Sequence, residues 1–147
     1  MKKLLSIKEL SKNYLTKKQV ICALKNINLE IEENDFTILV GPSGCGKSTI
    51  LSIIGGLENK SDGNLIIYKP DLKVGYMFQE DALFPWLNVL DNCLLGLKIN
   101  GKLKKEDINY VKYLLKKYGL SNFENSYPRE LSGGMRQRVA WMQYRHR

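Results

Sequence analysis

The sequence predicts an α/β fold in which a β-rich core is followed by a helical region. Residues 20–31 alternate between apolar and polar side chains, and residues 36–40 form a short run of apolar and β-branched residues. A glycine-rich loop follows that run, and beyond residue 89 apolar residues recur at helical spacing. The change from strand to helix periodicity indicates where the β-rich part gives way to helices.

The expected strands lie before residue 80. Residues 20–31 predict a half-buried strand that ends in an acidic turn at residues 32–35. Residues 36–40 show no polar face, which is typical of a strand buried on both sides in a parallel sheet. Residues 64–69 and 74–78 are further expected strands.

The expected helices follow from apolar spacing and from their end signals. Residues 48–56 predict a helix that a glycine pair ends. Residues 89–97 and 103–118 carry apolar side chains on one face, and in the second segment lysines take the other face. Ser132 is the expected cap of a last helix.

Composition is that of an ordinary globular domain, with 147 residues of which 44% are hydrophobic and 26% charged. No uncharged stretch reaches the roughly 18 residues of a membrane span, and the start does not read as a secretory signal, so we expect a cytoplasmic protein. The cysteines fit neither a zinc site nor a disulfide framework and are expected to be small fillers. The net charge of +8 would suit nucleic acid, anionic lipid or phosphate, but a solvated basic surface explains it as well.

Residues 41–49 read GPSGCGKST and fit the spacing G-x-x-x-x-G-K-[ST], between an expected strand and an expected helix. Glycines allow the backbone N–H groups to wrap closely round a polyphosphate. Lys47 would reach the β- and γ-phosphates, and Ser48 would offer its hydroxyl to Mg²⁺. The alternative is a glycine turn whose lysine is merely exposed. The expected ATP-binding residues of this loop are Gly41, Pro42, Ser43, Gly44, Cys45, Gly46, Lys47, Ser48 and Thr49.

Residues 131–140 read LSGGMRQRVA and resemble the signature of ABC transporter ATP-binding subunits, with Met135 in place of the more familiar Gln. The motif is a second glycine-rich turn at a helix start, so Ser132 and the N–H groups of Gly133 and Gly134 could take a γ-phosphate. A plain helix cap is the alternative. The resemblance implies a P-loop NTPase core of the ABC type, with an N-terminal antiparallel β part and a helical subdomain.

The same resemblance implies roles for further residues. Gln79 resembles the Q-loop glutamine, which in the family contacts Mg²⁺ and the attacking water, and Lys47 with Gln79 would be the catalytic residues present. Tyr14 resembles the aromatic residue that stacks on adenine, although an ordinary tyrosine is the alternative. Residues 82–92 resemble the importer ATPases for nitrate, sulfonate, taurine and bicarbonate.

The family also implies partners. Two subunits face each other head to tail, and each ATP lies between the phosphate loop of one and the signature, Ser132 to Met135, of the other. We therefore expect a homodimer bound to transmembrane permease subunits on the inner face of the cell membrane, importing a small anion or sulfonate-like solute. No nucleic acid partner is expected, because the long heptad segments of the DNA-repair and chromosome ABC proteins are not found.

The resemblance ends near Ala140. The apolar strand ending in Asp-Glu, the D-loop and the switch histidine of the family are not found, and His146 is not assigned the switch role. We expect a partial nucleotide-binding domain over residues 1–147, with a β-rich core (1–83), a helical subdomain (84–138) and an atypical tail (139–147).

A truncated or frameshifted gene product is the hypothesis for that ending. Hydrolysis would then be negligible without the acidic pair, and residues 36–40 could lack neighbouring strands and leave an apolar edge exposed. The alternative to an importer ATPase is accordingly a protein that binds ATP without hydrolysing it.

Overall fold

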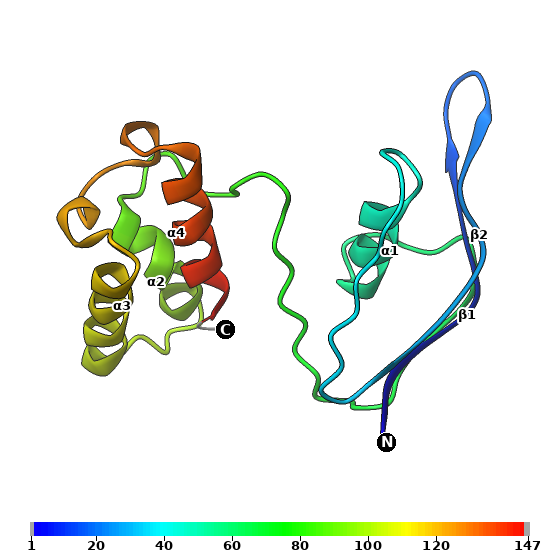
Figure 1. Ribbon diagram of the computed structural model, residues 1–147, viewed down its shortest axis with the longest axis horizontal. Helices are drawn as coiled ribbons and strands as arrows, with labels where there is room; N and C mark the ends of the chain where they lie inside the picture. Colours follow the sequence, from blue (N-terminus) through cyan, green and yellow to red (C-terminus); the bar gives the residue numbers. More distant parts are fainter. Residues whose placement is uncertain (1, 146–147) are drawn as a thin grey trace. The chain divides into compact units, whose positions relative to one another are not determined.

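The computed structural model describes residues 2–145, with side chains described up to residue 143. The chain packs as two compact units, Met1–Val74 and Gly75–Arg147, which we call the strand unit and the helical unit. Each has a hydrophobic core of its own, and Figure 1 shows the helices and strands of both. The expected domain boundaries at residues 83 and 138 stay predictions, and His146 lies outside the described residues.

The strand unit is built on a three-stranded antiparallel sheet. Its strands are β1 (Lys3–Leu15), β2 (Val20–Glu32) and β3 (Asp62–Ile67), in the order β2-β1-β3. β1 and β2 form a long hairpin whose register runs from Lys3 opposite Glu32 to Leu15 opposite Val20. β1 is therefore the central strand, and both of its edges are paired.

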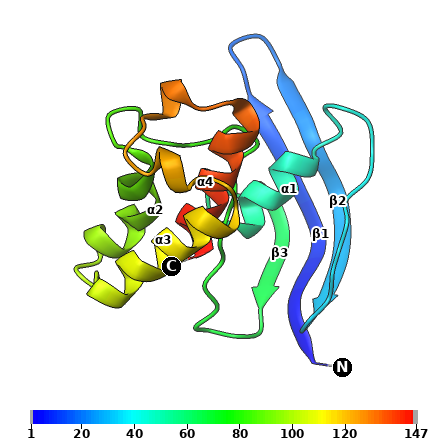
Figure 2. The same ribbon diagram turned by 60° about the vertical axis from the view of Figure 1, so that its left-hand side comes forward.

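Helix α1 (Lys47–Ile54) covers one face of this sheet, as Figure 2 shows. Its buried side chains, Ile50 and Ile53, pack against apolar residues of the hairpin. Removal of this apolar surface from water is the main favourable term that holds helix and sheet together. The buried members of the core are Leu5, Ile7, Leu10, Leu24, Ile50 and Ile53.

The expected elements of this unit are confirmed in part. β2, β3 and α1 lie close to the expected ranges, although β3 begins two residues earlier, at Asp62. β1 was not expected as a strand, because its register shifts and the left-handed backbone of Glu9 (φ 51°) obscure the apolar alternation.

The prediction of a strand at residues 36–40 is wrong for the described residues. These residues pair with no described strand, and Phe36 and Val40 are 90% and 89% exposed. A strand needs a neighbour to satisfy its backbone N–H and C=O groups, so an apolar run without one does not form a sheet. Residues 74–78 are likewise not a strand, for the same reason.

The helical unit contains α2 (Val89–Ile99), α3 (Lys105–Lys117) and α4 (Gly133–Arg145), with short 3₁₀ turns at Ser121–Phe123 and Pro128–Glu130. These helices confirm the expected ones. The buried residues of their shared core are Val89, Cys93, Leu94, Val111, Leu114, Leu115, Leu120, Leu131, Val139 and Met142.

The antiparallel β part, the helix after the glycine-rich loop and the helical subdomain confirm the predicted mixed α/β fold. Among the described residues, no helix combines the length and the apolar composition needed to cross a membrane.

Candidate functional site

The glycine-rich loop ends at the start of α1, and its backbone shape depends on two glycines. Gly44 and Gly46 have φ angles of +80° and +91°, in the left-handed region that other residues rarely adopt. Gly46 is also the N-cap of α1. The first N–H groups of any helix have no partner within it, so the loop delivers free donors and the positive end of the helix dipole.

Close packing also favours glycine at position 46. A Cβ at this position would lie 2.6 Å from Leu24 Cδ2 and 2.7 Å from the Ala23 carbonyl oxygen. The end of the loop therefore packs directly against β2. Gly41 is similar, because a Cβ there would lie 2.8 Å from Cys45 Sγ.

Lys47 folds back over the loop. Its Nζ donates hydrogen bonds to the carbonyl oxygens of Gly41 and Pro42, at 2.7 and 2.6 Å, and lies 3.5 Å from Cys45 Sγ. The ammonium thus lies against the carbonyl oxygens at the start of the loop. Ser48, the next residue, is exposed.

Tyr14 belongs to the same unit as the loop and lies near the end of β1. Its Cα partner on β2 is Ile21, a few residues from Ala23 and Leu24, against which Gly46 packs. At about 3.3 Å of rise per strand residue, this places Tyr14 on the order of 10 Å along the hairpin from the loop. The hairpin therefore brings the expected adenine-stacking residue and the phosphate loop to the same end of the strand unit.

The second glycine-rich turn starts α4. The Ser132 side chain accepts a hydrogen bond from the Met135 N–H at 3.4 Å, and its carbonyl accepts one from the Arg136 N–H at 2.9 Å. The expected role of Ser132 as a cap is confirmed. Ser132, Gly133 and Gly134 are exposed, which leaves their backbone accessible to a ligand.

Gln79 lies at a hollow in the helical unit with a volume of about 390 Å³. The lining residues are Gln79, Glu80, Asp81, Gly133, Arg136 and Gln137. The structure thus brings Gln79 near one residue of the signature turn, within a single unit.

The three cysteines differ in exposure, and the described residues form no metal-binding cluster. Cys22 and Cys45 are exposed, so the expectation that they fill the core is wrong, whereas Cys93 is buried. Burial raises the pKa of the Cys93 thiol to about 12. Within residues 2–143, no group of three or more His, Cys, Asp or Glu side chains could hold a metal ion.

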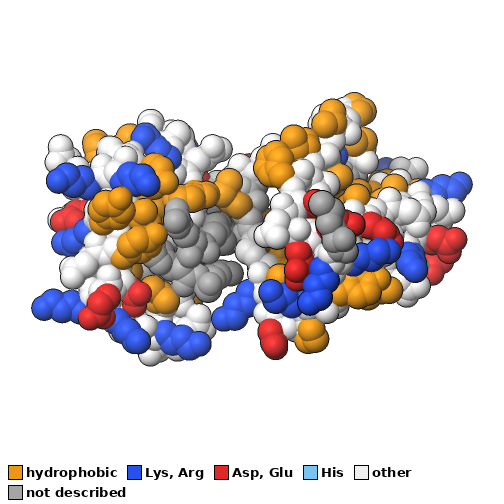
Figure 3. Space-filling model, turned by 60° about the horizontal axis from the view of Figure 1, so that its bottom comes forward, with side chains coloured by type: hydrophobic (Ala, Val, Ile, Leu, Met, Phe, Trp, Pro, Cys, Tyr) orange, Lys and Arg blue, Asp and Glu red, His pale blue; other side chains and the backbone are white. Residues whose placement is uncertain are grey.

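The basic side chains do not gather at one place on the face drawn in Figure 3. Lys and Arg side chains are scattered there among acidic and apolar ones, on both units. This distribution is that of a solvated charged surface, as the composition suggested.

Residues 24–145, which include both glycine-rich turns, match the sequence profile of the ABC transporter family. The chain belongs to the ABC transporter family. Its sequence identity to individual family members agrees with this assignment. It is 46% identical over 140 residues to an aliphatic sulfonates import ATP-binding protein of Bacillus cereus, with 92% of the chain and 55% of that protein covered.

A second relative of this ABC chain is a nitrate import ATP-binding protein of Synechocystis, 43% identical over 141 residues, with 92% of the chain and 53% of that protein covered. The chain therefore spans about half the length of the curated relatives it matches. Among solved structures it resembles the ATP-binding cassette MJ0796, a dimer in a post-hydrolysis state bound to ADP and Pi. The TM-score is 0.83 and the identity 35%, over 96% of this chain and 68% of that one.

One feature of the site that the sequence did not predict is the position of Arg136. Its Nε donates to Asp81 Oδ2 at 2.7 Å, and its Nη1 donates to the Leu131 carbonyl at 2.9 Å. Arg136 thus connects the turn that carries Ser132 to the segment that follows Gln79. Only the tertiary structure reveals the contact, since residues 81 and 136 are 55 positions apart.

Proposed function

We propose that this chain supplies the ATP-binding part of an ABC importer, and that residues 41–49 bind ATP together with Mg²⁺. The observation that carries the proposal is the geometry of the loop. Two left-handed glycines, the start of α1 and the folded-back Lys47 converge on one small region. Backbone N–H groups and one lysine are what a polyphosphate requires.

The residues present fit a triphosphate. The Lys47 ammonium has loop carbonyls as its partners, and phosphate oxygens, which carry full charge, are stronger acceptors than carbonyls. A rotation of a flexible side chain is enough to exchange them. The exposed hydroxyl of Ser48 fits Mg²⁺, because this ion takes few protein ligands and completes its shell with phosphate oxygens and water.

The other predicted residues have places in the same function. Tyr14 would stack on the adenine base, Gln79 would contact Mg²⁺ and the attacking water, and Ser132 to Met135 would bind the γ-phosphate held by a second subunit. The dimeric form of the similar cassette MJ0796 supports such a pair of subunits. Charge neutralisation by Lys47 and the helix dipole would stabilise the phosphates.

Import of a small anion or sulfonate-like solute is the transport function we propose. Its support is the similarity to import ATP-binding proteins for aliphatic sulfonates and for nitrate. The chain would then work on the cytoplasmic side of the membrane, bound to permease subunits.

Calorimetric titration of the purified chain with Mg–ATP tests the proposal. Binding is expected, and Lys47→Ala should weaken it by about tenfold or more, since each charge-assisted hydrogen bond contributes about 1.5–3 kcal/mol. Lys73→Ala is the matched control, because Lys73 is exposed and lies outside the loop. Absence of binding by the folded chain, or equal affinity of the Lys47 and Lys73 variants, would overturn the proposal.

Release of inorganic phosphate from the bound nucleotide distinguishes the two forms of this function. An ATP hydrolase releases phosphate on mixing with Mg–ATP, and the rate falls in Gln79→Ala. Binding without phosphate release would favour the alternative of a protein that only binds ATP.

A further inference from the structure

We propose that Lys12 is a positioning residue that orients Tyr14 for the adenine base of ATP, a role that rests on the proposed binding of ATP by residues 41–49. Neither the loop motif nor the signature includes Lys12. Its position in the strand unit nevertheless connects Tyr14, α1 and the phosphate loop.

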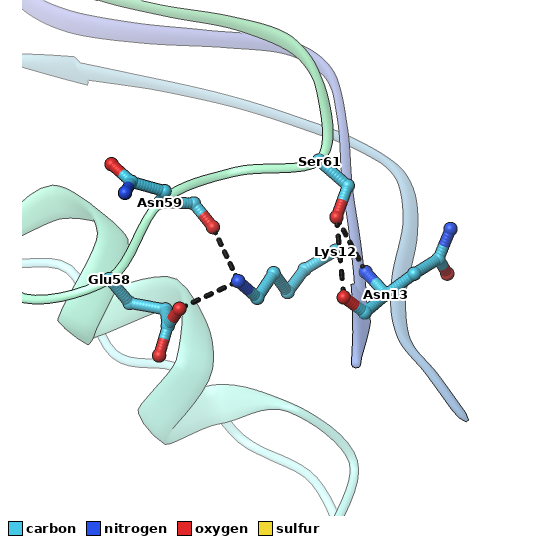
Figure 4. Close-up of polar contacts among 5 residues, drawn as sticks. All are labelled: Lys12, Asn13, Glu58, Asn59 and Ser61. Carbon is cyan, nitrogen blue, oxygen red and sulfur yellow. Dashed lines mark hydrogen bonds and ion pairs between the residues drawn. The ribbon is translucent and has the colours of Figure 1, made fainter. Parts of the chain in front are cut away.

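Lys12 is buried to an extent that is unusual for a lysine. It is only 9% exposed, and lysines are rarely buried unless their charge is paired. Its Nζ donates to Glu58 Oε1 at 2.6 Å and to the carbonyl oxygen of Asn59 at 2.7 Å (Figure 4). Both partners follow α1, so the side chain ties β1 to the end of the helix.

The same ammonium lies over the ring of Tyr14, at 4.7 Å from the ring centroid. At this distance the cation is attracted to the negative face of the ring. Because Nζ is anchored by Glu58 and Asn59, the attraction restricts the orientation of the ring. The ammonium occupies one face of the Tyr14 ring, and a base would stack on the other.

The backbone around Lys12 is fixed as well. The Asn13 N–H donates to Ser61 Oγ at 2.9 Å, as Figure 4 shows, and the Ser61 N–H donates to the Ser11 carbonyl at 2.9 Å. The Cα partner of Lys12 on β2 is Leu24, whose side chain packs on Gly46 of the phosphate loop. Lys12 therefore lies between the residue that would contact the base and the loop that would hold the phosphates.

Glu58 supplies the carboxylate that faces the Lys12 ammonium. The hydrogen bond from Lys12 lowers the pKa of the Glu58 carboxyl below its ordinary value, so the carboxylate stays ionised at neutral pH. The side chain that lies over the Tyr14 ring is therefore held in an ion pair with Glu58.

A purely structural brace would hold β1 and α1 together without any effect on base recognition. The two roles predict different effects of a Lys12 substitution on the affinity for ligands with and without a base. Mg–ATP contains adenine, whereas inorganic tripolyphosphate with Mg²⁺ offers the phosphates alone. The orientation of the Tyr14 ring therefore affects the affinity for Mg–ATP but not the affinity for tripolyphosphate.

Calorimetric titration of the chain with both ligands is the test. Lys12→Met should lower the affinity for Mg–ATP by about threefold to thirtyfold, the range of a desolvated cation–π contact, and should change tripolyphosphate affinity by less than about twofold. Lys12→Arg, which keeps the cation, should recover most of the loss. Lys8→Met, at an exposed lysine of the same strand, is the control and should bind both ligands as the unchanged chain does.

A double-mutant cycle with Tyr14→Leu strengthens the test. If Lys12 acts through Tyr14, the double variant loses no more ATP affinity than Tyr14→Leu alone. Should Lys12→Met fail to fold, Glu58→Ala removes the carboxylate that anchors Nζ, at the more exposed partner of the pair, and the same selective loss of ATP affinity is expected.

The outcomes separate the role of Lys12 from the proposed function. An unchanged ATP affinity in Lys12→Met, or an equal loss for ATP and tripolyphosphate, would overturn the role of Lys12 and leave ATP binding intact. Failure of the unchanged chain to bind either ligand would instead overturn the proposed function.

Discussion

The helices of the helical unit and the segment 36–40 of the strand unit contain similar apolar residues but differ in how far they bury them. In the helical unit, α2, α3 and α4 bury a continuous core. In the strand unit, the apolar run at residues 36–40 is largely exposed, and only Leu39 packs partly against the core. A helix satisfies its backbone hydrogen bonds within itself, whereas a strand must find a neighbour. An apolar segment can therefore become a helix without a neighbour, whereas it becomes a strand only beside another strand.

The largest expected difference between the two units is in the reactivity of their cysteines. Burial in the helical core raises the pKa of Cys93 to about 12, from an ordinary 9.0, which lowers its thiolate fraction at pH 8 by about 10³-fold relative to an ordinary thiol. Cys22 and Cys45 of the strand unit are exposed. Iodoacetamide labelling followed by mass spectrometry should therefore modify Cys22 and Cys45 long before Cys93. Comparable labelling of all three would mean that the helical core opens readily.

Truncation of a core side chain should have the next largest effect. Leu114 is fully buried on α3, so Leu114→Ala should lower the free energy of unfolding by about 2–5 kcal/mol. Both tryptophans of the chain, Trp86 and Trp141, belong to the helical unit, so urea unfolding followed by tryptophan fluorescence reports on that unit. The matched change in the strand unit, Val40→Ala, should shift urea unfolding followed by circular dichroism by less than about 0.5 kcal/mol. Equal effects would contradict the difference in burial.

Loss of a buried amide should have a smaller effect. Asn92 of α2 is fully buried; its Oδ1 accepts from the Phe84 N–H at 2.8 Å and its Nδ2 donates to the carbonyls of Phe84, Leu87 and Asn88. Asn92→Ala should lower the stability of the helical unit by about 1–3 kcal/mol, because it leaves buried backbone groups unpaired. The exposed Asn100, which ends the same helix, is the control, and Asn100→Ala should give a clearly smaller change in the same fluorescence measurement.

A pH effect in the strand unit should be the smallest. The Lys12 hydrogen bond holds the pKa of Glu58 below its ordinary 4.5 in the folded chain. The ion pair thus stabilises the fold above about pH 4.5, and this contribution is lost as the pH falls through the lowered pKa. The protection factors of β1 amides, which correct hydrogen exchange for its intrinsic pH dependence, should fall over that interval in the unchanged chain, and Glu58→Gln should remove the step. Persistence of the step in Glu58→Gln would assign it to another carboxylate.

The sequence by itself determined the helices of the second half, the glycine-rich loop before α1 and the capped turn before α4. These features depend on local rules: apolar spacing along one face, glycine where φ is positive, and a serine that caps a helix. Gly46 illustrates the limit of such rules. The motif predicts glycine at this position from the sequence. The close contact with β2, which also excludes a larger side chain, is seen only in the structure.

Only the tertiary structure decided which strands form and which distant residues meet. β1 became the central strand although bulges hide its pattern, and residues 36–40 did not become a strand although their pattern is clear. The contacts of Lys12 with Glu58 and of Arg136 with Asp81 join residues 46 and 55 positions apart. Strand pairing and ion pairing depend on what the rest of the chain places alongside, so local sequence patterns do not contain them.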